Sequence, residues 1–68
     1  MKIERRDINC ERVDGIPGRY RVTRDLTVDG HPYSAALECA NPAFGERILD
    51  NWERKTLERI AAAEQKAA

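Results

Sequence analysis

Hydrophobic and polar residues alternate on both sides of the Asp29-Gly30 dipeptide. Asp-Gly between alternating segments predicts a β-hairpin, because a two-residue type I′ turn needs positive φ at both of its central residues. With this turn, Val28 faces His31, and the pairing continues along both strands. One face of the predicted hairpin is then almost entirely apolar, with the pairs Leu26–Tyr33, Arg24–Ala35, Val22–Leu37 and Tyr20–Cys39.

The other face of this hairpin is polar. It carries the pairs Thr27–Pro32, Asp25–Ser34, Thr23–Ala36 and Arg21–Glu38. A slip of one residue would mix the two faces, so the pattern specifies one register and predicts strands over 19–28 and 31–39. Arg24 is the one charged residue on the apolar face. We expect its stem to lie over apolar surface while its guanidinium reaches water.

A third strand is predicted over 7–13, before a segment dense in turn formers, Asp14 to Gly18. If Val13 faces Arg19 across this segment, two further pairs fall on the apolar face, Cys10 with Val22 and Ile8 with Arg24. The first half of the chain is therefore predicted to form a three-stranded antiparallel β-meander with one apolar face.

One long helix is predicted over 42–66. Asn41 suits the N-cap, Pro42 suits the first helical position, and good helix formers dominate the rest. The stripe that we expect to pack on the sheet contains Phe44, Ile48, Leu49 and Trp52, with Gly45 on the same side. The whole chain, 1–68, is thus predicted to be a single α+β domain, a three-stranded antiparallel meander followed by one C-terminal helix packed on one sheet face (βββα).

This helix is longer than the strands predicted beside it. It would span about 36 Å, whereas strands of about seven residues span about 23 Å. Small domains often complete their core by association. We therefore expect a homodimer through the overhanging half of the helix. The alternatives are that the amino-terminal segment around Ile3 covers this half, or that its end frays. The candidate interface residues are Leu57, Ile60, Ala61 and Ala63.

The composition of the chain limits which classes of function we expect. The chain has 68 residues, of which 41% are hydrophobic and 35% charged, and its twelve basic and twelve acidic residues give a formal net charge of zero. No apolar run is long enough for a membrane span or a signal peptide, so we expect a cytoplasmic protein without a membrane partner. Nine of the twelve basic residues are Arg and nine residues are Ala, a bias typical of GC-rich bacterial or phage genomes.

Few residues are suited to catalysis or metal binding, and the predicted strands place them far apart. His31 and Cys39 would be about 26 Å apart on one strand, too far to share a metal ion. Cys10 and Cys39 would lie on outer strands about 9.5 Å apart, beyond disulfide reach, and are interpreted as small core residues. No base is predicted beside a nucleophile, and no phosphate-binding loop is present. We expect no metal, no cofactor and no enzymatic activity.

Two function classes remain. The first is a small regulatory, adaptor or inhibitor protein that acts through protein contacts. The alternative is a DNA-binding domain, because some three-stranded sheets enter the major groove. Its contacts would come from the polar sheet face and the basic first segment: Arg5, Arg6, Arg12, Arg19, Arg21 and Thr23. The zero net charge, and Glu11, Asp25 and Glu38 on the same face, favour the protein-contact hypothesis.

Overall fold

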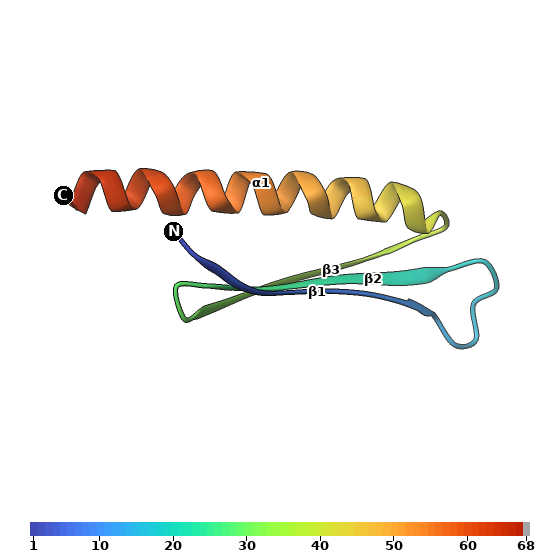
Figure 1. Cartoon of the computed structure of the whole chain (residues 1–68). Helices are drawn as coiled ribbons and strands as arrows, with labels where there is room; N and C mark the ends of the chain where they lie inside the picture. Colours follow the sequence, from blue (N-terminus) through green and yellow to red (C-terminus); the bar gives the residue numbers. More distant parts are fainter. Residues whose placement is uncertain (68) are drawn as a thin grey trace.

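The computed structural model describes residues 1–67, which form one open three-stranded antiparallel sheet with a helix along one face (Figure 1). The strands are β1 (Ile3–Arg12), β2 (Tyr20–Val28) and β3 (His31–Cys39), in the sheet order β1-β2-β3. They are followed by helix α1 (Pro42–Ala67). This arrangement confirms the predicted βββα architecture.

Both strand registers are the predicted ones. Val28 pairs with His31 at the turn and Tyr20 pairs with Cys39 at the far end of the hairpin. On the other side of β2, Cys10 pairs with Val22. Asp29 and Gly30 have φ values of 50° and 82°, the two left-handed conformations that a type I′ turn requires.

β1 begins at Ile3, earlier than predicted, because the β2–β3 turn binds the amino-terminal segment. The Lys2 amide donates a hydrogen bond to Asp29 Oδ1 at 2.8 Å, and the Asp29 amide donates to the Lys2 carbonyl at 2.9 Å. The bond from the Lys2 amide lowers the pKa of Asp29, because it stabilises the charged carboxylate. The register shifts between Ile3 and Arg5, where the strand adapts to this attachment.

The apolar core is small and centred on β2. Its fully buried apolar residues are Val22, Leu26, Val28 and Leu49. α1 packs over β2 and β3, so the helix-side face of β1 is left largely uncovered. Ile8 is 51% exposed and Cys10 is also exposed. The prediction that Cys10 is a core residue is therefore wrong, whereas Cys39 is half-buried beneath the start of the helix.

The helix packs on the sheet through only part of the predicted stripe, and Trp52 is half-buried. Gly45 and Leu49 are buried, but Phe44 and Ile48 are 58% and 43% exposed. The helix comes closest to the sheet at Gly45, where an added Cβ would lie 2.8 Å from Cys39 Sγ. This close approach sets the rotation of α1 about its axis, and that rotation directs Phe44 and Ile48 away from the core.

Gly45→Ala is expected to destabilise the fold, although alanine normally favours a helix interior. The exchange gains about 1 kcal/mol of helix propensity, but forcing a methyl group into a packed contact costs about 1–3 kcal/mol. Three side chains would lie within 3.2 Å of the new Cβ. We predict a net loss of about 1 kcal/mol in the free energy of unfolding, measured by urea denaturation. A gain in stability would contradict this close approach.

Candidate protein-binding surface

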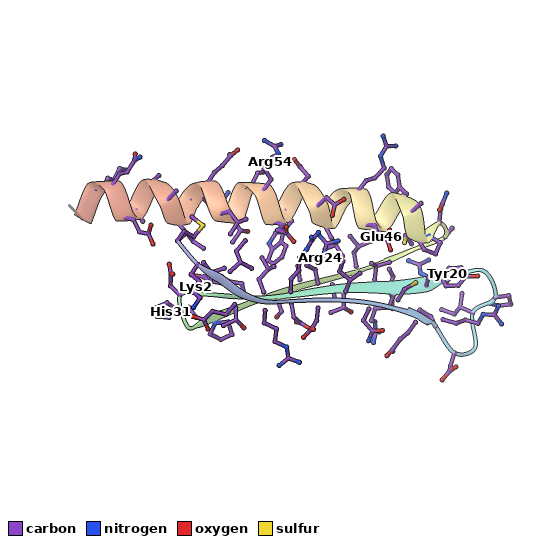
Figure 2. The ribbon with its side chains drawn as sticks, viewed as in Figure 1. Lys2, Tyr20, Arg24, His31, Glu46 and Arg54 are labelled. Carbon is purple, nitrogen blue, oxygen red and sulfur yellow. The ribbon has the colours of Figure 1, made fainter. Side chains whose placement is uncertain are left out.

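Arg24 lies buried between the sheet and the helix (Figure 2). It is 1% exposed, and its Nη1 donates hydrogen bonds to Asp50 Oδ1 at 2.7 Å and to Glu53 Oε1 at 3.1 Å. The prediction that its guanidinium reaches water is therefore wrong. Two carboxylates of α1 bind Nη1 and take the place of water there, as burial of a charge requires, while the buried Nε has no hydrogen-bond partner.

Arg6 joins this ion cluster from β1. Its Nε lies 3.0 Å from Glu53 Oε1, and its Nη2 lies 3.8 Å from Asp50 Oδ1. The two arginines and two carboxylates cancel in charge and connect α1 to both β1 and β2. The cluster also shows which side of the helix faces β1, because Asp50 and Glu53 are the residues that reach Arg6.

The opposite side of the helix carries large apolar residues, of which Phe44 and Ile48 are exposed and Trp52 is half-buried. Ile48 lies about 160° around the helix from Asp50, at 3.6 residues per turn, so it faces the β3 side. Phe44, four residues earlier, and Trp52, four residues later, lie on that same side. We call strand β3 together with Phe44, Ile48 and Trp52 the β3 flank.

The two edge strands of the sheet differ in charge. β1 has a register irregularity near its start, and six of its ten residues are charged: Glu4, Arg5, Arg6, Asp7, Glu11 and Arg12. Of the nine residues of β3, only Glu38 is an Asp, Glu, Lys or Arg. Charges and bulges on an edge strand discourage pairing with another chain. Of the two edges, β3 is therefore the less charged and the more regular, and Pro32 near its start is its one residue without an N–H for a further strand.

The second half of the helix holds the residues predicted as a homodimer contact. Leu57, Ile60 and Ala61 are half-buried and Ala63 is exposed. β2 and β3, the strands beneath the helix, have nine residues each, close to their predicted bounds but longer than the seven-residue strands used to estimate the overhang, so this part of α1 lies partly over the sheet. Ile60 lines a hollow of about 340 Å³ with Val28 and Tyr33. A homodimer contact through these residues stays a prediction.

The sheet face opposite the helix pairs its basic residues with acids. Arg21 Nη2 lies 3.1 Å from Glu38 Oε1, and Arg19 Nε lies 3.5 Å from Glu38 Oε2. Arg5 Nε lies 2.6 Å from Asp7 Oδ2. These ion pairs leave little uncompensated positive charge on this face.

The residues predicted to contact DNA do not share one face. Arg5, Arg21 and Thr23 belong to the face opposite the helix, and Arg19 lies at its end, just before β2. Arg6 and Arg12 pair with Leu26 and Tyr20, which places both arginines on the helix side of the sheet. The structure therefore brings four of the six predicted residues together and separates the other two.

Groups suited to catalysis or metal binding lie apart. Cys10 and Cys39 are free thiols on the two edge strands, and His31 lies exposed at the end of the β2–β3 hairpin (Figure 2). Within residues 1–67, no three His, Cys, Asp or Glu side chains gather as a metal site. In the same described part of the chain, no helix is long and apolar enough to cross a membrane.

Comparison with known proteins gives no assignment. No protein-family model matches the sequence, and no match was found among curated proteins or among solved structures. The function is therefore inferred from the surface of this chain alone.

The ion cluster predicts an asymmetry between two substitutions. Glu53→Gln removes one charge that faces the buried Arg24, and we expect a loss of about 1–3 kcal/mol in the free energy of unfolding. Arg24→Met removes the guanidinium that Asp50 and Glu53 share, and removing one partner of a buried ion pair costs about 3–5 kcal/mol. We expect it to cost more than Glu53→Gln in urea denaturation, because the Gln side-chain oxygen can still accept a hydrogen bond from Arg24. An equal or smaller loss for Arg24→Met would contradict the role given to the cluster.

Proposed function

We propose that the protein is a small non-enzymatic regulator, adaptor or inhibitor that acts through protein contacts made by the β3 flank. One observation carries this proposal: large apolar side chains remain exposed on a fold with four fully buried apolar residues, and Phe44 on α1 is the most exposed of them, although Met1, Ile3, Ile8 and Ile16 are exposed as well. Phe44 and Ile48 lie one helical turn apart, on the side of α1 that faces β3, whose one Asp, Glu, Lys or Arg residue is Glu38. An apolar helix side beside an open strand edge offers a partner both side-chain and backbone contacts.

The accessible surface supports the same proposal. The chain exposes 5043 Å², whereas a compact monomer of its mass exposes about 4,400 Å². The excess of about 650 Å² is close to the roughly 800 Å² that each partner buries in a specific protein interface of standard size. This excess belongs to the whole elongated chain, so it supports association in general and does not by itself locate the contact.

DNA binding through the sheet face opposite the helix receives less support. Affinity for the phosphate backbone comes from Lys and Arg side chains that neutralise phosphates. Arg5, Arg19 and Arg21 already lie beside the carboxylates of Asp7 and Glu38. A phosphate would have to compete with these carboxylates.

Affinity capture with the tagged full chain, from cells of its own host, tests the proposed function. The test variant carries Phe44→Glu and Ile48→Glu. The matched control is Ile8→Glu, because Ile8 is also apolar and is 51% exposed, but lies on β1. We expect a protein that the wild type and the control retain and that the test variant loses at least tenfold, with binding then measured using the purified pair.

Circular dichroism checks that all three proteins are folded. The same captured proteins for all three chains, or losses confined to Ile8→Glu, would contradict contact through the β3 flank. A salt-dependent shift of mixed-sequence DNA that Arg21→Glu abolishes would favour the DNA alternative.

A further inference from the structure

We propose that the partner of the β3 flank is a second copy of this chain. Two β3 strands would pair antiparallel, joining two sheets into one six-stranded sheet with both helices on the same face. This inference rests on the proposed protein-contact function and names the partner for it.

The backbone of β3 is available for such pairing. The type I′ turn makes Val28 and His31 a hydrogen-bonded pair, and bonded and non-bonded pairs then alternate along the hairpin. Ser34, Ala36 and Glu38 therefore direct their N–H and C=O groups away from β2. Pro32 occupies the remaining outward position within β3 and offers no N–H to a further strand, so the pairing would rest on the backbone groups of Ser34, Ala36 and Glu38.

The side chains of β3 are compatible with self-pairing. A two-fold axis normal to the sheet relates antiparallel strands and keeps both helices on one face. With this axis beside Ala35, Tyr33 of one copy faces Leu37 of the other, and Ser34 faces Ala36. Glu38 faces Pro32, so no like charges lie opposite each other.

The position of α1 distinguishes β3 from β1 as the joining edge. Because α1 packs over β2 and β3, joining two copies through β3 would place the helix axes about 10 Å apart at ordinary strand spacing. This distance is close to the 8–10 Å that separates the axes of two packed helices. Joining through β1 would hold the axes about 19 Å apart and would leave Ile48 exposed.

The helix sides that meet across this axis carry Phe44, Ile48 and Trp52, together with the basic residues Lys55 and Arg59. Arg24 pairs with Ala35 and binds Asp50, so the axis beside Ala35 passes near Asp50 on the helix. In antiparallel helices related by this axis, Ile48 of one copy faces Trp52 of the other, and Phe44 lies one turn further out. Lys55, on the same side, lies towards the end of the contact, where its stem can cover apolar surface while its ammonium reaches water.

Light scattering on the full chain, over a series of concentrations, tests this inference. We expect the wild type to reach twice the chain mass of 7.8 kDa. Ile48→Glu should weaken self-association at least tenfold, because it places a carboxylate in the helix contact. The control Ile8→Glu should associate like the wild type. Ala36→Pro, which removes an outward N–H from β3, gives a second test if Ile48→Glu does not fold.

Other results would overturn the inference. A wild-type chain that stays at 7.8 kDa at the highest concentration has no second copy as partner, although capture of another protein through the β3 flank would still support the proposed function. A dimer that Leu57→Asp disrupts and Ile48→Glu leaves intact would place the contact on the second half of α1. A dimer sensitive only to Ile8→Glu would place it at β1.

Discussion

The burial of Arg24 is the constraint on which the rest of the structure depends. A guanidinium enclosed between sheet and helix requires carboxylates nearby, and Asp50 and Glu53 meet this requirement from α1. They turn one side of the helix towards β1, while the close approach at Gly45 holds its first turns against Val22 and Cys39. Phe44 and Ile48 are left facing outward. The contacts that attach the helix therefore also create the exposed β3 flank.

The strand pairing could be predicted from sequence because local signals agree with each other. Asp29-Gly30 specifies the turn, alternation specifies the faces, and the Asn41 side chain accepts a hydrogen bond from the Ala43 amide as an N-cap should. The rotation of the helix could not be predicted in this way. A stripe centred on Ile48 and one centred on Leu49 differ by a single residue, about 100°, and the choice depends on the tertiary partner of Arg24.

Site residues were harder to predict, because small differences in register and strand length decide where they point. Arg5 and Arg6 are neighbours, but they face opposite sides of β1. The overhang of the helix was estimated from seven-residue strands, whereas β2 and β3 have nine residues each, and Leu57 and Ile60 are half-buried. The contrast in charge between residues 3–12 and 31–39 is visible in the sequence. This contrast becomes informative about association once the strand order places both strands at the edges of the sheet.

Amide hydrogen exchange at the two sheet edges tests the central claim most directly. The Val13 amide bonds to the Arg19 carbonyl, so alternation directs the Ile8 and Cys10 amides away from β2, as it does those of Ser34 and Ala36 on the other edge. Pairing through β3 predicts that the Ser34 and Ala36 amides become protected as protein concentration rises, while those of Ile8 and Cys10 exchange rapidly throughout. Rapid exchange at Ser34 and Ala36 at every concentration, or protection at Ile8 and Cys10 instead, would contradict it.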